Sequence, residues 1–437
     1  MAGFAARLDR YFSLRSAGTS VRTELLAGLT TFLTMVYIVF VNPAILADAG
    51  IPARAAMTAT CLAAGCGTLL MGLWARQPIA LAPGMGVNAY FTYGVVQGLG
   101  VPWQAALGIV FLSGALFFVL ALAGVRRQIL EAIPRELYAA IAAGIGLFLA
   151  LIGLRNAGVV AANEATLVGL GDLSQPATLV ALAALIATAA LIAWRVRAAV
   201  ALGVLGAAAA GAVLGVFPSA PPAAAGGSAD AFLALDLAAA LDLNLLDIVF
   251  AFLFVDLFDT LGTVIAVTSR AGLMSPSGEI PRLRRMLTVD SASTMLGAAF
   301  GTSTVTCYIE SAAGVEAGGR TGLTAVTVGV LFLFALPVAP LIGPLPAAAT
   351  APALILVGAM MMSMVRETDW EAPVVAIPSF LILALIPLTS SIATGLAAGF
   401  VTYDLLKILS GQGRQVSWMT HTLAALFILR FAYLAAS

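Results

Sequence analysis

Charged residues are scarce in this chain. Only 10% of its 437 residues are Asp, Glu, Lys or Arg, whereas 61% are hydrophobic. Soluble domains carry about 25% charged residues, so this composition excludes a soluble protein and indicates one that lies in a lipid bilayer. The formal net charge is zero, which argues against a nucleic-acid partner.

Histidine and cysteine are nearly absent as well. The single histidine, His421, lies near the C-terminus, so a central site would lack the commonest metal ligand and proton shuttle. The cysteines, Cys61, Cys66 and Cys307, lie in apolar segments without metal-ligand spacing, and we expect them to pack as small side chains. Asp and Glu therefore remain as the proton carriers.

The sequence motifs of common membrane enzymes and pumps are missing. There is no Walker A pattern GxxxxGK[ST], no HExxH and no GxSxG. These patterns supply the phosphate cradle, the metal ligands and the nucleophile of the respective classes. We therefore expect neither an ATP-driven pump nor an enzyme, and no cofactor.

Apolar runs of about 20 residues are typical of membrane-spanning helices. They predict fourteen segments, of which the third and tenth are too short to cross alone: 24–47, 54–75, 86–98, 103–124, 136–154, 176–194, 198–217, 245–268, 286–300, 307–318, 321–341, 346–364, 372–389 and 391–409. We expect the tail 411–437 to form an interfacial helix rather than a further span.

Basic residues divide across these segments as membrane topology requires. With the N-terminus inside, nearly all arginines fall on the cytoplasmic side, and only Arg54 and Arg155 fall outside. The stretch 217–244 contains three aspartates and no basic residue, which is typical of an external loop. We therefore expect a multi-pass protein of the inner (plasma) membrane with both termini in the cytoplasm, and residues 1–22 predict no cleavable signal.

The two short segments look like duplicates of one another. The stretch 77–99 aligns with the region around 301–319 at an offset of about 222 residues. Each has an extended lead-in and then a polar residue, Asn88 or Glu310, at the head of a short helix of small residues. Seven segments per half is an odd number, so the second half enters the membrane from the opposite side. We predict an all-α fold of two inverted seven-segment repeats, with the binding site at the paired half-helices.

The heads of two half-helices would present unpaired backbone N–H groups to a flat ligand with ring nitrogens and carbonyls. Gly84 and Gly86 would let the backbone approach the ligand, and Asn88 offers both a donor and an acceptor. A carboxylate such as Glu310 at membrane depth indicates function and could accept N–H groups of a base. The alternative is a glycine-bearing kink that serves only helix packing.

Segment eight carries a second group of polar residues. Asp256 and Asp259 are three residues apart and share a helix face, with Thr260 and Thr263 beside them. Two carboxyl groups buried together repel each other when both are charged, so we expect at least one to bind a proton. The alternative is a hydrogen-bonded pair between helices.

Several residues near the half-helices have less specific signals. Tyr308 and Phe91 could stack on a base, although packing is the commoner role of such rings. Glu316 lies four residues before Arg320, which predicts an ion pair within the helix. Asp290 is expected at the start of segment nine, near the membrane interface.

Three long motifs resemble the signatures of a known family. APGMGVNAYFTY (82–93), FVDLFDTLGT (254–263) and TSTVTCYIESAAGVEAGGRTGLTA (302–325) resemble AzgA-like purine permeases, a branch of the nucleobase–ascorbate (xanthine/uracil) permease family. The likeness extends from residues 27–46 to the last segments. It implies proton symport of purine bases (hypoxanthine, guanine or adenine) and, from the family alone, a homodimer through the gate domain.

The resemblance also implies a division into domains. The expected parts are an N-terminus at 1–23, a core domain at 24–125 and 245–342, a gate domain at 126–217 and 343–410, an external loop at 218–244 and a tail at 411–437.

The same likeness assigns roles to individual residues. Asp256 and Glu310 take the positions of the substrate-binding carboxylates, Asn88 that of the polar residue of segment three, and Asp259 that of the second acid of segment eight. Backbone groups near Val87 and Ile309 would reach the base. Proton coupling would fall to Asp256, Asp259 or Glu310. Other branches have a glutamate where Asp256 stands and often a histidine in segment one or eight, which is absent here.

An anion exchanger or channel on the same seven-plus-seven plan is the alternative function. Such a protein should place a cation at the half-helix heads, where this chain has Asn88 and Glu310. We therefore expect a purine nucleobase and membrane lipid as the partners of this protein.

Overall fold

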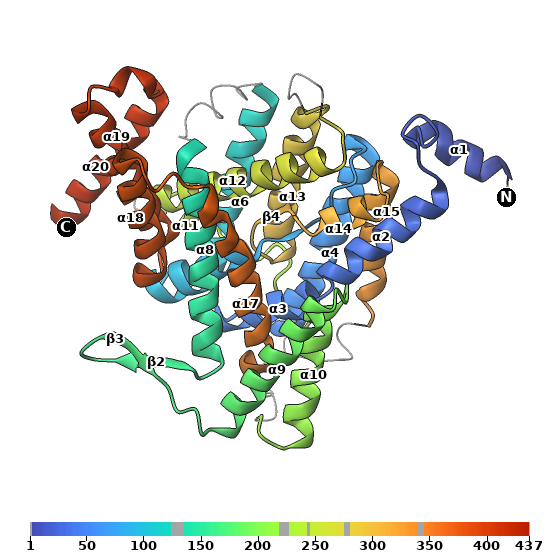
Figure 1. The fold of residues 1–437 in the computed structure, drawn as a ribbon, viewed down its shortest axis with the longest axis horizontal. Coiled ribbons are helices and arrows are strands. Elements are labelled where there is room, and N and C mark those ends of the chain that lie inside the picture. The colour runs from blue at the N-terminus through green and yellow to red at the C-terminus, as the bar shows by residue number, and fades with distance from the viewer. Residues whose placement is uncertain are drawn as a thin grey trace.

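The computed structural model describes residues 2–123, 135–217, 227–242, 245–274, 280–338 and 345–436. Figure 1 shows an almost entirely helical molecule in which the chain ends lie on opposite sides, α1 on one and α20 on the other. The predicted domain boundaries at 125–126 and 342–343, the start of the predicted external loop at 218, and Arg126 and Arg127 lie outside the described residues.

Helices make up the elements of the first half of the chain apart from three short strands. They are α1 (Ala2–Phe12), α2 (Val21–Met35), α3 (Ile38–Asp48), α4 (Ala53–Leu70), the π-helical η1 (Met71–Ala75), β1 (Leu81–Pro83), α5 (Met85–Ala89), the π-helical η2 (Tyr90–Gly98), α6 (Trp103–Ala123), α8 (Arg135–Asn156), β2 (Val160–Asn163), β3 (Leu167–Leu170), α9 (Pro176–Ala193) and α10 (Ala199–Val213).

The second half contains one short strand among its helices. Its elements are α11 (Leu237–Ala240), α12 (Leu246–Arg270), α13 (Leu283–Phe300), β4 (Val305–Cys307), α14 (Ser311–Glu316), α15 (Gly322–Ala335), α17 (Ala347–Met362), the 3-10 helix η5 (Ser363–Glu367), α18 (Pro373–Thr389), α19 (Ile392–Leu409), the 3-10 helix η6 (Gly413–Gln415) and α20 (Trp418–Ala436).

Every predicted segment coincides with a helix, so the helix positions are confirmed. Among the described residues, eight helical stretches are long and apolar enough to cross a membrane, with α2 and α3 counted together as one stretch, and four shorter apolar helices accompany them. The tail is a helix, α20, that packs against α19. Fourteen membrane segments in two inverted repeats remain a prediction.

The first predicted span, 24–47, is not one continuous helix. It divides into α2 and α3 at Val36 and Tyr37. At this break the Tyr37 side chain reaches the second half of the chain, where its hydroxyl donates a hydrogen bond to Glu310.

The long helices pack in two groups. In the first group α6 packs against α13, α4 against α15 and α3, and α2 against α14 and α15. In the second group α8 packs against α17 and α18, α18 against α19, and α9 against α10 and α17. Smaller contacts of α5 with α8, α3 with α17 and α12 with α19 join the two groups.

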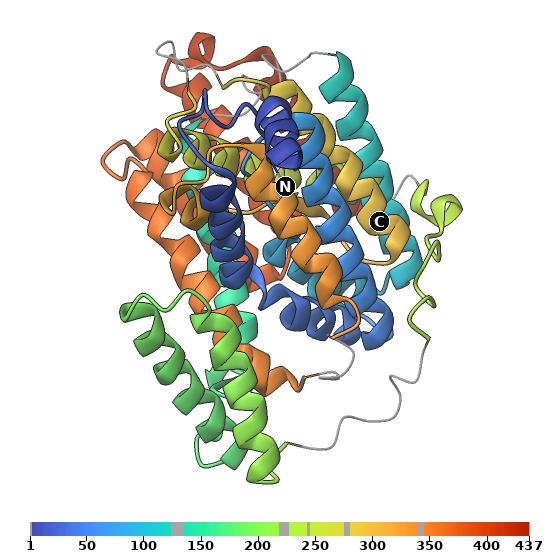
Figure 2. The same cartoon turned by 90° about the vertical axis from the view of Figure 1, so that its right-hand side faces the viewer.

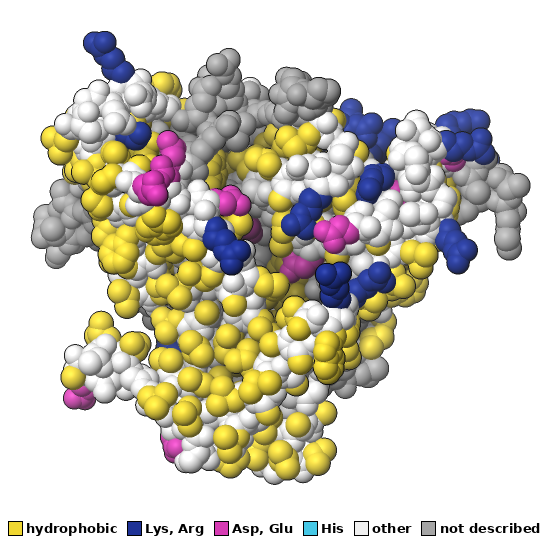
Figure 3. Space-filling model, viewed as in Figure 1, with side chains coloured by type: hydrophobic (Ala, Val, Ile, Leu, Met, Phe, Trp, Pro, Cys, Tyr) yellow, Lys and Arg dark blue, Asp and Glu magenta, His cyan; other side chains and the backbone are white. Residues whose placement is uncertain are grey.

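The two ends of the molecule differ in character. In Figures 1 and 2 the helices α9 and α10 project together at one end, away from α1. On the face in Figure 3 the Lys and Arg side chains gather mainly in the other half of the molecule and toward the side of α1. The projecting end is covered largely by hydrophobic side chains.

A hairpin between α8 and α9 was not predicted. Strands β2 and β3 pair antiparallel, with Val160 opposite Leu170 and Asn163 opposite Leu167. The side chain of Asn163 accepts hydrogen bonds from the backbone N–H groups of Ala165 and Thr166, which stabilises the turn. The apolar run of segment five ends before this hairpin, so hydropathy gave no sign of it.

Candidate substrate and proton site

The site is built around a short two-stranded crossing. Strands β1 and β4 pair antiparallel, with Leu81 opposite Cys307 and Pro83 opposite Val305. Each strand leads directly into a short helix, β1 into α5 and β4 into α14. The predicted extended lead-ins are confirmed, and their pairing brings the two half-helices together although they are more than 200 residues apart in the chain.

A threonine from the preceding helix holds each strand in place. The Thr68 hydroxyl donates to the Leu81 carbonyl at 2.8 Å and accepts from the Leu81 N–H at 2.9 Å. In the other half, the Thr294 hydroxyl lies 3.0 Å from the Val305 carbonyl. A threonine of the helix before each strand therefore contacts a carbonyl of that strand in both halves of the chain.

Asp256 is held at the back of this crossing. Its side chain, on α12, is 1% exposed, and Oδ2 accepts a hydrogen bond from the Thr294 hydroxyl at 3.0 Å. The other oxygen, Oδ1, is buried without a hydrogen-bond partner among the described residues. Such an oxygen is costly unless it binds a proton or a ligand.

Asp259 lies one turn further along α12 and is half-buried. A Cβ added to Gly84 would stand 3.8 Å from its Oδ2, so this carboxyl group reaches the head of α5. The neighbouring Thr260 hydroxyl makes a 2.9 Å hydrogen bond with the Thr306 hydroxyl of β4, and Thr263 is buried below it. The predicted polar face of segment eight therefore faces the crossing.

Glu310 stands at the head of α14, immediately before its first residue. Its side chain is half-buried, and Ile309 beside it is 49% exposed. The Tyr37 hydroxyl donates a 3.0 Å hydrogen bond to its Oε1. The carboxyl group of Glu310 is also close enough to Asp259 for their charges to interact. Asp259 thus lies at the head of α5 and Glu310 at the head of α14.

Asn88 is fully buried and belongs to a polar network. Its Nδ2 donates to Oδ1 of Asn42, and Asn42 donates in turn to the hydroxyls of Thr60 (2.8 Å) and Thr302 (3.0 Å). Asn88 Oδ1 has no hydrogen-bond partner among the described residues. The network ties α3, α4 and α5 to the residues that precede β4.

The remaining predicted contact residues are packed in this structure. Val87 and Phe91 lie in the hydrophobic core, and the hydroxyl of the buried Tyr308 donates to the Pro83 carbonyl at 2.5 Å. A Cβ added to Gly86 would stand 2.2 Å from Ile145 of α8, so this glycine allows a close approach of two helices. Of this set, Tyr308 lies closest to the crossing.

Asp290 is a residue of the site that the sequence analysis missed. The prediction that it begins segment nine was wrong, because α13 already begins at Leu283 and Asp290 is fully buried within this helix. Its Oδ1 accepts from the Cys307 N–H at 3.1 Å, and its charge interacts with those of Asp256 and Asp259. An acidic residue inside an otherwise apolar segment was the signal that could have identified it.

The predicted pair of Glu316 and Arg320 is also wrong. Glu316 instead forms a 2.9 Å ion pair with Arg270 at the end of α12. Arg320 donates to the carbonyls of Val315 and Gly319, which neutralises the end of α14.

Within the described residues, no group of three or more His, Cys, Asp or Glu side chains could hold a metal ion. An apolar cavity between α12, α19 and α20 is lined by Phe254, Phe258, Phe400, Phe427 and two leucines. It offers no polar group that could recognise a base, so the carboxyl cluster at the crossing is the candidate site.

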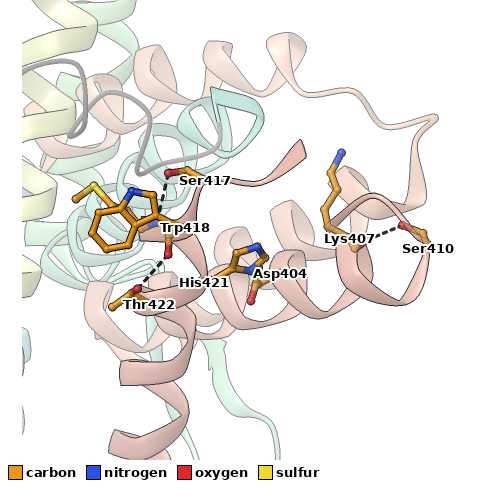
Figure 4. Close-up of polar contacts among 8 residues, drawn as sticks. Asp404, Lys407, Ser410, Ser417, Trp418, His421 and Thr422 are labelled. Atoms are coloured by element: carbon orange, nitrogen blue, oxygen red, sulfur yellow. Dashed lines mark hydrogen bonds and ion pairs between the residues drawn. The ribbon is translucent and has the colours of Figure 1, made fainter. Parts of the chain in front are cut away.

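A second polar cluster joins the C-terminal helix to the rest of the protein (Figure 4). His421 of α20 lies with its Nδ1 2.6 Å from Oδ1 of Asp404 on α19, and Asp404 is 8% exposed. Lys407 lies one turn further along α19 and donates to the side chain of Gln412. The single histidine of the chain is thus part of a helix contact far along the sequence from the central crossing.

We expect His421→Ala to destabilise the docking of α20. The substitution leaves the Asp404 carboxylate buried without its partner, which costs about 1–3 kcal/mol. Limited proteolysis after residue 412 should become faster, and the melting temperature in detergent should fall. Thr422→Ala is the matched control because the Thr422 hydroxyl donates to the Trp418 carbonyl of its own helix. Equal stability of the two variants would contradict this role.

Comparison with known proteins shows the family of this chain. Residues 22–398 match the model of the xanthine/uracil permeases, described as "Permease family". The chain belongs to this permease family. As a permease, the protein is a transporter and not an enzyme, and its apolar helices are those of a multi-pass membrane protein.

Two relatives are similar to this chain over nearly their whole length. "Adenine permease AdeQ" of Escherichia coli is 43% identical over 428 residues, which are 97% of this chain and 96% of that protein. "Guanine/hypoxanthine permease PbuO" of Bacillus subtilis is 44% identical over 430 residues, which are 96% of this chain and 99% of that protein.

A solved structure with the same fold is the transmembrane domain of a cyanobacterium bicarbonate transporter, BicA. Its TM-score is 0.62 at 17% identity, with 86% of this chain and 97% of that chain covered. At this identity the likeness extends to the fold alone, so it carries no argument about the transported molecule.

Proposed function

We propose that the protein is a proton-coupled symporter that carries purine nucleobases into the cell by alternating access. The relatives named for adenine and for guanine or hypoxanthine are almost equally similar to this chain. The proposal is therefore for purine bases as a class.

The position of Glu310 is the observation that carries the proposal. Its carboxyl group is half-buried at the meeting point of the two half-helices, where its Oε1 accepts a hydrogen bond from Tyr37. A carboxylate accepts several hydrogen bonds, so it can also take N–H groups from a base edge. A ligand without those donors would leave the carboxylate desolvated and unpaired, which provides selectivity.

Other residues of the crossing would complete the base site. Asp256 would accept a second N–H group of the base, and the exposed backbone beside Ile309 would be within its reach. The rings of Tyr308 and Phe91, and the backbone of Val87, are buried here, so they would contact the base only after a rearrangement. Asn88 would support the head of α5 through Asn42.

The aspartates behind the crossing support proton coupling. Asp256, Asp259 and Asp290 interact with one another, and Oδ1 of Asp256 and Oδ2 of Asp290 are buried without hydrogen-bond partners among the described residues. Burial and the repulsion between neighbouring carboxylates both disfavour the charged form, so at least one of these carboxyl groups should bind a proton. We assign the coupling proton to Asp256 or Asp259, with Asp290 beside them.

The two groups of helices would supply the moving parts. The group around α4, α6, α13 and α15 would be the core domain that holds the base, and the group around α8, α17, α18 and α19 would be the gate. A largely rigid movement of one against the other would expose the site to each side in turn. The basic half of the molecule would lie on the cytoplasmic side of the inner membrane. Two copies of the chain would form a homodimer through their gate domains.

An anion exchanger is not favoured. An anion at the crossing would need a nearby cation, and among the described contacts of the crossing the charged groups are Asp256, Asp259, Asp290 and Glu310. These would repel an anion.

Competition uptake tests the proposed function. We expect labelled hypoxanthine or adenine to enter a host without purine transporters, and unlabelled purines to compete while sulfate and bicarbonate do not. One proton driven by 100 mV releases about 2.3 kcal/mol, enough for about fiftyfold accumulation. A protonophore should therefore abolish accumulation, and accumulation that is insensitive to both protonophore and external pH would refute proton coupling.

A further inference from the structure

Glu310 receives its hydrogen bond from an unexpected part of the chain. The donor is the hydroxyl of Tyr37, which is 273 positions away in the sequence. Tyr37 lies at the break in the first span and is the residue that precedes α3. None of the sequence patterns identified this residue as part of the site.

The Tyr37 side chain is fixed rather than mobile. It is 2% exposed and lies in the main hydrophobic core. Its hydroxyl is therefore delivered to one place, and the bond to Glu310 costs little additional conformational entropy.

The helix before the break is locked to the half-helix region of the second repeat. Glu24 of α2, which is fully buried, accepts from the Arg320 N–H at 2.9 Å and from the Thr324 hydroxyl at 2.6 Å. In addition, a Cβ on Gly314 of α14 would stand 2.1 Å from the Thr31 hydroxyl of α2. The backbones of α2 and α14 thus lie in direct contact.

The helix after the break is held as firmly. Asn42 of α3 donates to Thr60 of α4 and to Thr302, three residues before β4. Tyr37 therefore lies between two anchors, and both connect the first span to the chain that carries Glu310.

We propose that Tyr37 is a positioning residue that orients the Glu310 carboxylate for the base. This inference rests on the proposed function. Glutamate has several rotatable bonds, so without a restraint its carboxylate would have to be ordered each time a substrate binds. The Tyr37 hydroxyl binds Oε1, and the other acceptor sites of the carboxylate would remain available to the base. Such preorganisation is expressed as affinity and selectivity rather than as transport rate.

The first test is the kinetics of Tyr37→Phe in the full chain. A hydrogen bond to a charged group contributes enough for about a tenfold effect or more. We expect KM for the transported purine to rise about tenfold, while the maximal rate changes less than about twofold. The differences in KM between purines should become smaller, because selectivity is lost. An unchanged KM with unchanged preference, or a lower KM, would overturn the proposal.

Tyr93→Phe is the matched control. Tyr93 donates a 2.7 Å hydrogen bond to the carboxylate of Asp48 at an exposed position, so the variant loses the same kind of bond away from the crossing. We expect its KM to match that of the wild type. A similar rise in KM in both variants would show a general loss of structure and would also overturn the proposal.

A second measurement does not depend on the substrate. A hydrophobic carbodiimide reacts with accessible carboxyl groups, and mass spectrometry quantifies modified Glu310 in the purified protein. Freed from Tyr37, Glu310 should be modified about tenfold faster in Tyr37→Phe and unchanged in Tyr93→Phe. If the wild type transports no purine, the proposed function fails, yet this rate still decides whether Tyr37 restrains Glu310. Equal rates in wild type and Tyr37→Phe would overturn the restraint itself.

Discussion

Purine uptake by the Glu310→Ala variant should fall about a hundredfold or more below that of the wild type. The substitution removes the acceptor for the base N–H groups and leaves the buried Tyr37 hydroxyl without its partner. Truncating one partner of a desolvated, charged hydrogen bond is among the most costly changes at a binding site. The measurement is initial uptake of labelled hypoxanthine or adenine, corrected for the amount of protein in the membrane.

Two further variants make this result specific. Glu310→Gln keeps the shape and one acceptor oxygen but removes the charge, so we expect uptake between those of wild type and Glu310→Ala. Glu316→Ala removes a glutamate from the same short helix, but its partner Arg270 is exposed. Such surface pairs contribute little, and its uptake should stay within about twofold of the wild type. Normal uptake by Glu310→Ala would refute the assignment of the site.

Asp256→Asn should separate binding from proton coupling. The amide cannot take up a proton at the buried position where Oδ1 now lacks a partner, while it can still accept the hydrogen bond from Thr294. We expect accumulation to fall from about fiftyfold to none. Exchange of internal for external purine should continue with a higher KM, because the amide also offers the base one acceptor fewer than the carboxylate. Accumulation against a gradient and counterflow are measured in the same proteoliposomes.

The matched control for this experiment is Asp172→Asn. Asp172 is exposed in the turn before α9, where it accepts from Ser174 and Gln175. Its variant should accumulate purine as the wild type does. If Asp256→Asn loses both exchange and accumulation, Asp256 serves base binding alone. If the variant accumulates purine as the wild type does, another residue carries the coupling proton.

The positions of the helices follow from local information. A run of about 20 apolar residues has to satisfy its backbone groups internally in lipid, and a helix does this within the segment itself. The short segments at 86–98 and 307–318 were recognisable for a similar reason, because glycine and β-prone residues lead into each. The sequence repeat then placed Asn88 and Glu310 at equivalent points.

The partners of the site residues could not be predicted in this way. Asp290 was misplaced because its burial depends on the packing of α13 against α4 and α6. Glu316 was assigned to Arg320 because spacing on one helix is visible in the sequence, whereas the position of Arg270 at the end of α12 is not. Tyr37 gave no signal at all, since a tyrosine in an apolar segment is common.

The sequence by itself determined that this chain is a membrane protein and where its helices lie, and it singled out Glu310, Asp256 and Asp259 as the candidate carboxyl groups of its site. Hydropathy and the hydrogen-bonding needs of the backbone act over one helix at a time, which is why they can be read from the chain. Only the tertiary structure decided that β1 pairs with β4, that Asp290 stands behind Asp256 and that Tyr37 reaches Glu310. These contacts join residues far apart in sequence, and they depend on how whole helices pack against one another.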